Sequence, residues 1–564
     1  MPVGAESLRD VAIRLRGNHR HTDYYAESFT LGRSADISMN APRLYRIALP
    51  ALMVLPIFAY RDAYRGYFDA DDFGSLDWAR VVPLKDHIVS LPDLKYPNGR
   101  PVGYLYYGVM ARIAGFNFAP WVFALELVGA LNVALLWFLL RRFDFGEIES
   151  ALGCLFFALS YSLFDAWWKP AFIYDVLATT FALLMMLAYL RRWWILSFLA
   201  FWLAMRSKEI GVVLPAVLLI YEMVLGDRKW KRILPFFAPA LIYGWYGVWF
   251  TLHQPHTRYT LSIIKVWQPI LFYASSLFAV PYAGLLVPLL VLLVRDRRLY
   301  FALGAMACEL TIYFLLPGRL LPVYLYLAMT AAAIAIATLA TYYPRTVVIL
   351  LLAWIPWQYW QIRNAAAVAI SDGDERRGYV SAVHGVPDAP AYAFADEPAS
   401  FGPYGGEYVI KDFHGDVPVF PLQSLDLPAD QPLELLVWSR ISRRLTASTL
   451  IAEKYIFVEK AAALADWQGT WPPNAEGYRA AEGLVSVRMY RPASATQFVL
   501  EACGDAGKVL HITFDDLDLP NLVFTKPECV VRVSPLDRER GRIMGVHFNP
   551  EGHAHVDIGR FGFR

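Results

Sequence analysis

Charged residues are scarce in this chain. Only 18% of its 564 residues are charged, whereas soluble proteins have about a quarter, and 57% are hydrophobic. The formal net charge is +2, so the chain lacks the strong field that attracts proteins to nucleic acid. Together these shortages exclude a nucleic-acid-binding protein and predict an integral membrane protein.

Cysteine is scarce, and no cleavable leader is expected. Four cysteines are too few for a disulfide scaffold, and Cys154 and Cys308 lie in apolar segments. Cys503 and Cys529 share the C-terminal region and can pair in an oxidising compartment. The first forty residues are polar and have no short apolar core of a signal peptide, so residues 1–42 are expected to form a cytoplasmic tail.

Long apolar runs dominate residues 43–364. A membrane span needs about 20 apolar residues, and somewhat fewer inside a bundle. Reading for such runs gives about eleven candidate spans, near residues 44–60, 119–140, 149–166, 171–190, 193–205, 209–225, 232–252, 277–294, 299–316, 320–340 and 345–362. Residues 43–364 are therefore predicted to form a helical membrane domain.

The loops between these runs differ in charge. Lys and Arg gather in alternate loops, at 141–142, 191–192, 227–232 and 295–298. By the positive-inside rule these loops are cytoplasmic, which places the N-terminus inside and the C-terminal region outside the cell membrane, expected to be a bacterial inner membrane. The outer loop 62–103 is long and acidic, and runs 102–116 and 261–278 favour helices that lie in the membrane interface.

Residues 365–564 have a soluble composition. Short alternating runs predict strands at 407–410, 454–458, 484–490 and 529–533, and apolar runs predict helix at 433–445 and 450–459. The fold class expected for the whole chain is a polytopic α-helical membrane domain followed by an extracytoplasmic α+β domain rich in antiparallel sheet.

Three aspartates follow the first apolar run. Asp69, Asp71 and Asp72 lie at the expected boundary between membrane and water, where apolar walls raise the basicity of a carboxylate. Such a group can take the proton of an attacking hydroxyl. Asp71 and Asp72 can alternatively hold a divalent cation, and the turn can also be a solvated helix cap.

Basic residues mark the outer ends of several predicted spans. A phosphate on a lipid headgroup would be bound by two or three of them, although a cation that snorkels to the interface is the simpler reading of each. The set comprises Arg100, Lys169, Arg206, Lys208, Arg258 and Arg319. Lys208 and Glu209 can also form a simple ion pair, and Asp175 lies one turn inside a span.

The order of these residues resembles the GT-C superfamily of glycosyltransferases that use polyprenyl-phosphate sugars, which includes protein O-mannosyltransferases and TMTC-type transferases. The matching features are Asp71-Asp72 after the first span, Gly99-Arg100-Pro101, Lys208-Glu209-Ile210-Gly211 with Tyr221-Glu222, and Arg319 followed by Tyr324-Leu325-Tyr326-Leu327. The acidic motif differs from that of the superfamily, because this chain has Asp69-Ala70-Asp71-Asp72 in place of the usual acidic pair. The C-terminal region also lacks the helical repeats of the TMTC-type transferases.

The resemblance implies inverting transfer of a sugar from a polyprenyl-phosphate donor to an extracytoplasmic hydroxyl on a glycan, lipid or protein. It implies Asp71 as general base and Asp72 as its neighbour, or as a contact to acceptor or metal. Arg100, Lys208 and Arg319 would meet the donor phosphate, joined by Arg206 and Arg258. Asp69, Glu209, Lys169 and Tyr324 are expected to support the site.

Two other classes of function remain open. A transporter or flippase of an anionic or lipid-linked substrate should carry ionisable residues near mid-span and repeat symmetry between its halves. Here the charges concentrate at one face and no matching halves are seen. A non-catalytic anchor for the C-terminal domain would leave the outer acidic and basic residues without a role.

Overall fold

A computed structural model describes most of the chain and divides it into two compact units, Met1–Ala51 and Leu52–Arg564. All of the candidate site residues that it describes belong to the second unit. The described residues are 41–93, 99–253, 261–395, 397–401, 405–421, 432–439, 443–451, 457–458, 466–468, 479–481, 483–491, 495–514, 517–537 and 542–563.

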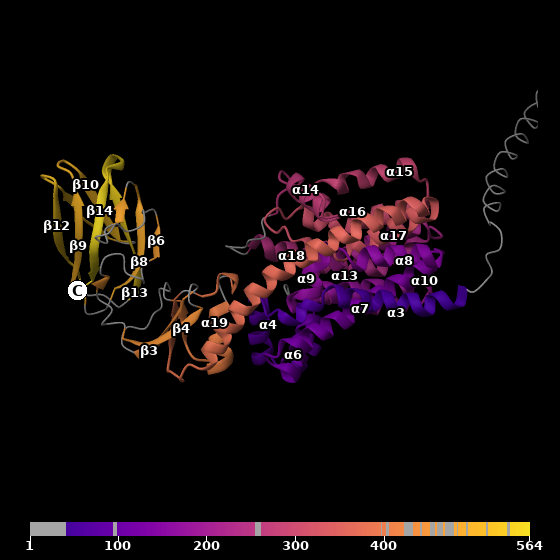
Figure 1. Ribbon diagram of the computed structural model, residues 1–564, viewed down its shortest axis with the longest axis horizontal. Helices are drawn as coiled ribbons and strands as arrows, with labels where there is room; N and C mark the ends of the chain where they lie inside the picture. Colours follow the sequence, from indigo (N-terminus) through magenta and orange to yellow (C-terminus); the bar gives the residue numbers. More distant parts are fainter. Residues whose placement is uncertain are drawn as a thin grey trace, which may run out of the picture. The chain divides into compact units, whose positions relative to one another are not determined.

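The described residues between 41 and 384 are mainly helical, and each of the predicted apolar segments contains helix (Figure 1). Helix α10 packs against α7 and α11, and helix α17 packs against α8 and α16. The α-helices are α3 (Ala41–Ala59), α4 (Ala70–Val81), α5 (Leu84–Val89), α6 (Pro101–Ala114), α7 (Phe118–Arg142), α8 (Glu147–Ala158), α9 (Phe164–Trp168), α10 (Ile173–Leu190), α11 (Trp194–Ser207), α12 (Leu214–Val224), α13 (Leu234–His253), α14 (Trp267–Ser276), α15 (Leu290–Leu293), α16 (Arg297–Phe314), α17 (Ala328–Tyr342) and α18 (Pro344–His384).

Short 3-10 helices connect or precede many of these α-helices. They are η1 (Arg61–Arg65), η2 (Tyr161–Leu163), η3 (Pro170–Phe172), η4 (Glu209–Val213), η5 (Trp230–Ile233), η6 (Ala283–Leu289) and η7 (Pro322–Leu325). Several precede a longer α-helix directly, so that a tight turn leads into the regular helix. Lys208 lies directly before η4, and Tyr324 lies within η7.

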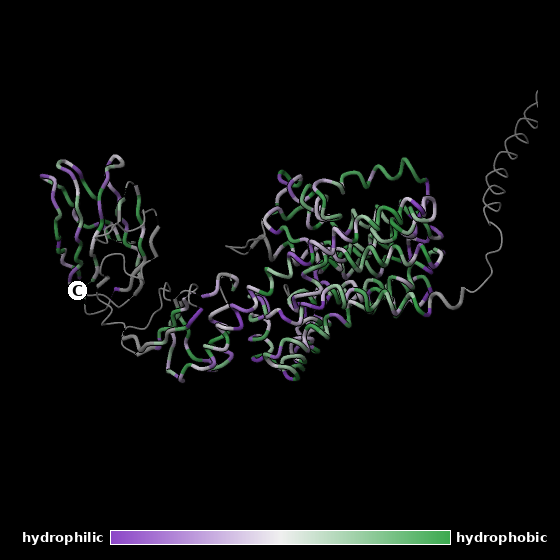
Figure 2. The backbone as a smooth tube through the Cα atoms, in the orientation of Figure 1, coloured by the Kyte–Doolittle hydropathy of each residue, from purple (hydrophilic) through white to green (hydrophobic). Residues whose placement is uncertain are grey.

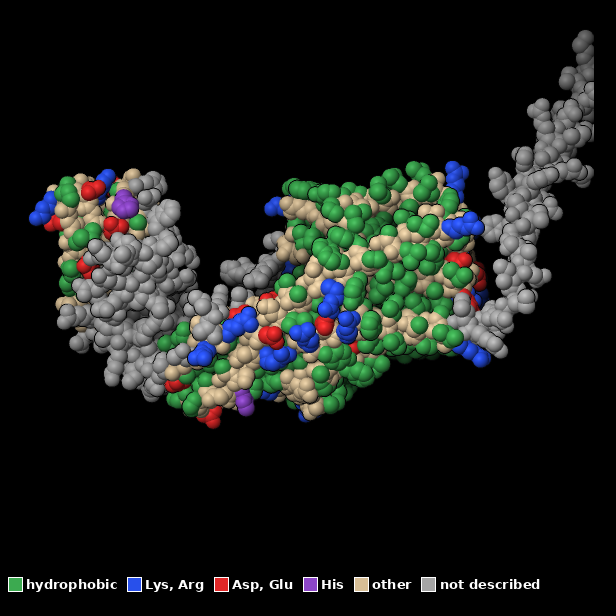
Figure 3. Space-filling view, in the orientation of Figure 1, with side chains coloured by type: hydrophobic (Ala, Val, Ile, Leu, Met, Phe, Trp, Pro, Cys, Tyr) green, Lys and Arg blue, Asp and Glu red, His purple; other side chains and the backbone are tan. Residues whose placement is uncertain are grey.

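Two helical segments in the described residues are long and apolar enough to cross a membrane alone, Phe118–Arg142 and Pro170–Leu190. A third candidate is the pair Glu147–Ala158 and Tyr161–Trp168, which is bent by 54°. The larger number of spans and the orientation stay predictions. Hydrophobic residues run along the helices in Figure 2, and hydrophobic side chains cover much of the visible helical face in Figure 3. Exposed examples are Trp245, Leu350 and Leu352.

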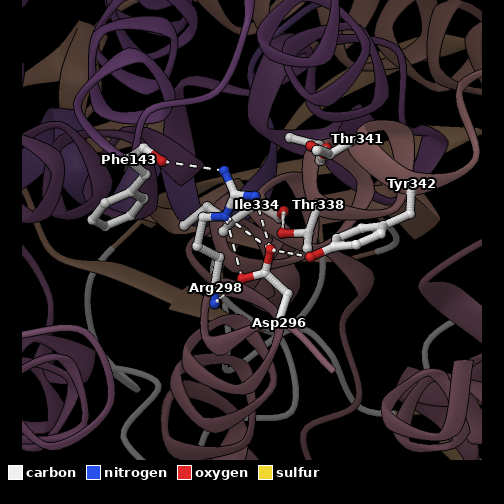
Figure 4. A network of polar contacts seen from close by, with 8 residues as sticks. Phe143, Asp296, Arg298, Ile334, Thr338, Thr341 and Tyr342 are labelled. Atoms are coloured by element: carbon white, nitrogen blue, oxygen red, sulfur yellow. Dashed lines mark hydrogen bonds and ion pairs between the residues drawn. The ribbon is translucent and has the colours of Figure 1, made fainter. Parts of the chain in front are cut away.

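A polar network fixes the start of α16 (Figure 4). The Asp296 side chain accepts from the backbone N–H of Arg298, which makes Asp296 the N-cap of the helix. The Arg298 guanidinium donates to Asp296 Oδ2 across 2.8 Å and to the Phe143 carbonyl across 3.4 Å. Tyr342 at the end of α17 donates to the same carboxylate. These bonds join the ends of α7, α16 and α17.

Helix α18 is 41 residues long and passes residues 364 and 365, where the composition changes from apolar to soluble. The predicted domain boundary therefore lies within a helix, and it stays a prediction. Pro344 occupies the first helical position, where its missing N–H costs nothing, and the helix ends before Gly385.

A small mixed sheet and one helix follow α18. The strand order is β2 (Val419–Pro421), β1 (Tyr392–Ala395), β3 (Pro432–Ser439) and β4 (Arg444–Ile451), with β1 parallel to both β2 and β3. Two sequence predictions were wrong here. The predicted strand 407–410 lies in helix α19 (Gly405–His414), where Gly405, Gly406, Val409 and Ile410 are buried at helical spacing. The predicted helix 433–445 forms β3, a turn at Arg443 and the start of β4.

The last region is a pair of antiparallel sheets. Their orders are β11-β10-β13-β8-β6 and β12-β9-β14-β5, with β7 pairing β14. The strands are β5 (Phe457–Val458), β6 (Asp466–Gln468), β7 (Arg479–Ala481), β8 (Val485–Arg491), β9 (Gln497–Gly504), β10 (Val509–Phe514), β11 (Asp518–Val523), β12 (Glu528–Pro535), β13 (Arg542–Pro550) and β14 (Val556–Phe563).

Alternate residues of these strands form one core. Phe498, Leu500 and Ala502 of β9 are buried against residues of β10, β13 and β14. The predicted strands 484–490 and 529–533 are confirmed as β8 and β12. The predicted helix 450–459 is wrong where it is described, because residues 450–451 belong to β4 and residues 457–458 to β5. Of the predicted strand 454–458, residues 457–458 are strand and residues 454–456 lie outside the described residues. Cys503 and Cys529 face each other across β9 and β12 and form a disulfide.

Candidate active site

The acidic turn forms the start of helix α4. Asp69 is the N-cap and accepts a hydrogen bond from Ala70 N across 2.8 Å. Asp72, three residues on, accepts from the backbone N–H of Asp69 across 2.7 Å. This reciprocal capping box satisfies backbone donors that a helix otherwise leaves without partners. The spacing of the aspartates therefore fixes where α4 begins, and it gives each carboxylate a different environment.

Asp72 points into the protein. Its side chain is fully buried, and Tyr107 of α6 donates to its Oδ1 across 2.5 Å. Burial raises the pKa of Asp72 to about 7, although the bonds from Asp69 N and Tyr107 oppose the shift. Both carboxylate oxygens of Asp72 thus have partners inside the protein. Its environment fits a helix cap better than a group that meets substrate.

Asp69 lies between two cations. Arg376 of α18 donates to its Oδ1, and the Lys169 ammonium contacts its Oδ2, each across 2.9 Å. Lys169 also contacts Asp165, one helical turn earlier, at 3.3 Å. Burial alone would raise the pKa of Asp69, but the charges of Lys169 and Arg376 outweigh it and hold this pKa below its usual value. Asp69 is therefore ionised at neutral pH.

Asp69 also lines a cavity of about 510 Å³. Asp165, Lys169, Asp372 and Arg376 add charge to its wall, and apolar groups of α18 form another side; the full lining is Asp69, Tyr161, Ser162, Phe164, Asp165, Lys169, Pro322, Ala365, Val368, Ala369, Asp372, Arg376 and Ser400. This volume falls within the range of small-molecule sites, roughly 300–1,000 Å³. Two buried atoms of the wall, Arg376 Nε and Ser400 Oγ, make no hydrogen bond within the described residues.

Asp71 is the exposed member of the turn. Its carboxylate makes no hydrogen bond or ion pair within the described residues, and it does not line the cavity. Ser75, one turn later on the same face of α4, pairs with the Tyr174 hydroxyl across 3.1 Å. Asp71 therefore lies on the face of α4 that leads toward Tyr174.

Two ion pairs contain two of the five predicted phosphate-binding residues, Arg100 and Lys208. Arg100 donates from Nε and Nη2 to the two oxygens of Glu209 across 2.9 and 3.0 Å, a bidentate pair. The Lys208 ammonium contacts both oxygens of Asp175 at 2.5 Å. The Arg100 guanidinium also lies 5.1 Å from the Tyr174 ring centre.

The aromatic rings around these pairs connect them to neighbouring elements. The Lys208 ammonium lies 4.5 Å from the ring centre of Tyr324, so these two residues are in contact. Tyr174 joins this cluster to α4 through Ser75. The Arg100 side chain is 28% exposed and that of Lys208 is 7% exposed, so Arg100 is the more accessible cation.

The other predicted basic residues are more scattered. Arg206 is fully buried, donates to the Ser90 carbonyl across 3.0 Å, and lies 5.5 Å from the Tyr243 ring centre. Arg319 is half-buried in the turn between α16 and η7, five residues before Tyr324. Arg258 lies outside the described residues.

Sequence reasoning missed the contribution of α18. Besides the Arg376 contact, Arg377 donates to the Gly66 carbonyl across 2.7 Å and its guanidinium lies over the Tyr67 ring. Gly373 allows the close approach, because a Cβ there would lie 3.0 Å from Tyr67 N. Cavity residues of α18 recur at helical spacing from Ala365 to Arg376, a signal that continues past the apolar run.

Asp165 and Tyr107 were also missed as contacts of the acidic turn. Asp165 and Lys169 lie four residues apart in the sequence, the spacing of helical ion pairs, and this spacing could have revealed them together. Tyr107 lies within the predicted interfacial run, where no local pattern marks it as the partner of Asp72.

The turn does not resemble a two-carboxylate metal site. Both oxygens of Asp72 are in hydrogen bonds, and Asp71 is exposed. Among the described residues, no group of three or more His, Cys, Asp or Glu side chains could hold a metal ion. The geometry therefore offers Asp71 alone as a carboxylate with open oxygens, and a metal requirement stays an untested prediction.

Comparison with known proteins gives one family match. Residues 97–245 match the family described as dolichyl-phosphate-mannose-protein mannosyltransferase. This segment includes Arg100, Lys169 and Lys208, whereas the acidic turn and Arg319 lie outside it. A comparison with curated proteins finds no match.

Solved structures with weak similarity include one protein bound to undecaprenyl phosphate and two transferases of arabinose units. ArnT from Cupriavidus metallidurans, bound to undecaprenyl phosphate, is 13% identical with a TM-score of 0.45; the alignment covers 72% of this chain and 98% of ArnT. Arabinofuranosyltransferase AftD from Mycobacteria is 12% identical with a TM-score of 0.38, covering 94% of this chain and 61% of AftD. Arabinosyltransferase EmbB from Mycobacterium smegmatis is 11% identical with a TM-score of 0.27, covering 96% and 66%.

The motifs quoted from the sequence and the family match point in the same direction. The resemblance to the GT-C glycosyltransferases that use polyprenyl-phosphate sugars is confirmed, and its sequence match lies in residues 97–245.

Proposed function

We propose that this protein transfers a sugar from a polyprenyl-phosphate donor to a hydroxyl group on the outer side of a membrane, with inversion at the sugar. One observation carries the proposal. An ionised carboxylate, Asp69, lines a cavity of about 510 Å³ and is held in position by Lys169 and Arg376. The family match over residues 97–245 supports the class of reaction.

Asp69 is the better candidate for the base on geometric grounds. A general base must lie within hydrogen-bond reach of the proton that it takes, and this requirement comes before its pKa. Asp69 lines the cavity, Asp72 is buried in its capping bonds, and Asp71 is exposed outside the cavity lining. We therefore assign to Asp69 the role that the resemblance implied for Asp71, and Asp71 becomes the alternative that the experiment must exclude.

The low pKa of Asp69 suits a base that acts late. Before the reaction, its carboxylate accepts a hydrogen bond from the acceptor hydroxyl and orients the oxygen toward the sugar. As the new bond forms, the hydroxyl becomes strongly acidic and its proton moves to the carboxylate. Lys169 and Arg376 hold Asp69 in place throughout, so that positioning and fixed charge supply much of the acceleration.

The donor phosphate would meet the cluster of Arg100 and Lys208. The phosphate leaves as an anion, and cations close to it lower the energy of the charge that develops. Glu209 and Asp175 fix the two cations, and Tyr174 connects them to α4 through Ser75. This cluster lies on the side of α4 where Asp72 meets Tyr107, because the Tyr107 ring stacks on Tyr174 with ring centres 6.0 Å apart.

The experiment compares single amide substitutions in the purified full-length protein. A panel of polyprenyl-phosphate hexoses and pentoses is offered, and the release of polyprenyl phosphate is measured. Asp69→Asn should lower the rate by roughly 10²–10⁴-fold, the usual effect of a general base. Asparagine is as good an N-cap as aspartate, so the start of α4 should remain intact.

Asp71→Asn and Asp86→Asn are the matched controls. Asp86 is an exposed carboxylate of the same outer loop, and both variants should retain activity and thermal stability. Loss in Asp71→Asn with full activity in Asp69→Asn would transfer the base role to Asp71. A wild-type protein that neither binds nor turns over any donor of the panel would contradict the transferase itself.

A further inference from the structure

A second pocket lies away from the acidic turn, between α4, α6 and α19. Its volume is about 340 Å³, and it is lined by Leu76, Ala79, Arg80, Ala111, Arg112, Gly115, Phe116 and Asp412. Phe116 stacks on Phe413 of α19 with ring centres 4.8 Å apart, which closes one side. At Gly115 a Cβ would meet nothing within 4 Å, so the pocket is open there.

A buried carboxylate of this pocket has an unused oxygen. The Asp412 side chain is only 5% exposed, and its Oδ1 lies 3.5 Å from Arg80 Nε. Its Oδ2 is buried and has no hydrogen-bond partner within the described residues. A buried carboxylate oxygen without a donor is costly, so it favours the binding of a group that supplies an N–H or O–H.

The charges around Asp412 favour a cationic donor. Arg80 is already shared among carboxylates, since its Nη2 donates to Asp77 across 2.9 Å and to Asp416 across 3.0 Å. With Asp412 this gives three carboxylates around one guanidinium. The local surplus of negative charge attracts an ammonium group, which would supply the missing donor to Oδ2.

The opposite side of the pocket carries a cation next to an apolar edge. Arg112 of α6 is exposed and lines the pocket, and one of its nitrogens donates to the Gly108 carbonyl. On the same helix Val109 is 38% and Ile113 is 73% exposed, and Val89 of α5 is 74% exposed. Exposed aliphatic groups beside an arginine are typical of a helix that lies in the membrane interface, with the guanidinium among lipid phosphates.

We propose that this pocket binds the headgroup of an aminophospholipid, with the ammonium on Asp412 Oδ2 and the phosphate on Arg112. The lipid's acyl chains would leave the pocket along Val109 and Ile113, where the helix is already apolar. The charge pattern matches both ends of such a headgroup. This site does not depend on the proposed transferase activity, and none of its residues belongs to the cavity around Asp69.

The test adds short-chain phospholipids to the purified full-length protein in detergent and measures thermal unfolding and lipid affinity. Phosphatidylethanolamine should raise the unfolding temperature most. Phosphatidylcholine carries a trimethylated nitrogen without N–H groups, and phosphatidylglycerol has no ammonium, so each should bind on the order of tenfold more weakly. Equal effects of all three lipids would overturn the proposal.

Two variants test recognition of the ammonium and of the phosphate separately. Asp412→Asn should abolish the preference for phosphatidylethanolamine over phosphatidylcholine, and Arg112→Gln should weaken the binding of all three lipids. Asp86→Asn and Lys85→Gln, both on exposed parts of the same loop, should change neither. An unchanged preference in Asp412→Asn contradicts the assignment. If that variant does not fold, Arg112→Gln and the wild-type lipid series still test whether the pocket binds the headgroup.

A last arm uses soluble glycerophosphoethanolamine, a phosphodiester with the same two charges as the lipid headgroup but without acyl chains. We expect a much smaller shift in unfolding temperature, because the apolar edge of α6 would contribute nothing to binding. An effect as large as that of the lipid would assign the pocket to a soluble ligand and overturn the lipid assignment.

Discussion

Arg376 of α18 donates from Nη1 to Oδ1 of Asp69 across 2.9 Å, and so joins two residues that lie 307 positions apart in the sequence. The Arg376 side chain is 5% exposed, so water weakens this pair little. Its role in the proposed reaction is positional, because the guanidinium fixes the carboxylate and holds its pKa down.

Arg376→Gln should therefore lower transfer by about 10- to 100-fold, the loss expected for one charge-assisted contact that positions the base. It should also change the pH profile. Removing a cation raises the pKa of Asp69, so the acidic limb of the rate profile should move to higher pH. Arg376→Lys should restore part of the rate and of the profile. A rate loss with an unchanged acidic limb would show that Arg376 does not act through Asp69.

Gly373 permits the contact between α18 and the segment before the acidic turn. A Cβ at this position would meet Tyr67 N at 3.0 Å and Gly66 C at 3.2 Å, and both are backbone atoms that cannot rotate away. Gly373→Ala should therefore reduce stability and transfer together, because either α18 or the turn has to shift.

Gly378 of the same helix is the matched control. Its Cβ would meet only Trp438 Cη2 at 3.6 Å, an ordinary contact. Gly378→Ala should leave transfer unchanged and add up to about 1 kcal/mol of stability, since alanine favours helix over glycine. Chemical unfolding and the donor assay of both variants provide the comparison, and equal effects of the two substitutions would contradict the close approach at Gly373.

The raised pKa of the buried Asp72 carboxyl should make the stability of the protein depend on pH. Burial raises its pKa to about 7 in the folded chain, whereas an unfolded aspartate titrates near about 3.9. Between about pH 4 and pH 7 the folded chain holds a proton that the unfolded chain has lost. The contribution of this group to stability is thus fully present below pH 4 and decreases as the pH rises through 7.

Asp72→Asn should remove that slope, because an amide does not titrate. The free energy of unfolding, measured from pH 4 to pH 8, should fall less steeply in the variant than in the wild type. Asp412 also has a pKa raised by burial to about 7, so Asp412→Asn should remove a separate part of the slope. A wild-type slope that persists in Asp72→Asn would contradict the protonated state of the buried cap.

Arg100 and Glu209 allow phosphate binding to be distinguished from a simple ion pair. Arg100→Gln should weaken donor binding and also leave the Glu209 carboxylate without its bidentate partner. The double variant Arg100→Gln/Glu209→Gln removes that second defect and should recover stability but not donor affinity. Recovery of donor affinity in the double variant would reduce Arg100 to a partner of Glu209. Thermal unfolding and a donor titration separate the two effects.

Local sequence patterns predicted much of the helical region. The apolar runs mark the helical segments correctly. Arg100, Lys169 and Lys208, which the sequence places at the ends of such runs, lie near acidic partners. The acidic turn was also recognised as a helix start among its alternatives. What the spacing of Asp69, Asp71 and Asp72 did not reveal is which carboxylate faces which environment, because the capping geometry decides this.

Contacts between residues far apart in the chain could not be predicted from sequence patterns. Arg376 reaches Asp69 only because α18 continues as a helix beyond the apolar run, and nothing in residues 365–376 alone indicates which loop they meet. The segments 407–410 and 433–445 were assigned to the wrong type because both are short and apolar. For such runs the neighbouring elements decide: β1 and β4 flank β3, and α19 buries one helical face.

Because α18 continues without interruption past residue 365, it limits where the C-terminal region can be exchanged for that of another protein. At a rise of 1.5 Å per residue its 41 residues span about 60 Å, and the helix brings Arg376 to Asp69 and Glu375 to Trp438 on neighbouring positions. The sheet of β1 to β4 and the acidic turn are thus both held by the same stretch of α18. A C-terminal region exchanged at residue 365 would take part of the wall of the cavity around Asp69 with it, whereas an exchange after His384 would leave the α18 side of that wall complete.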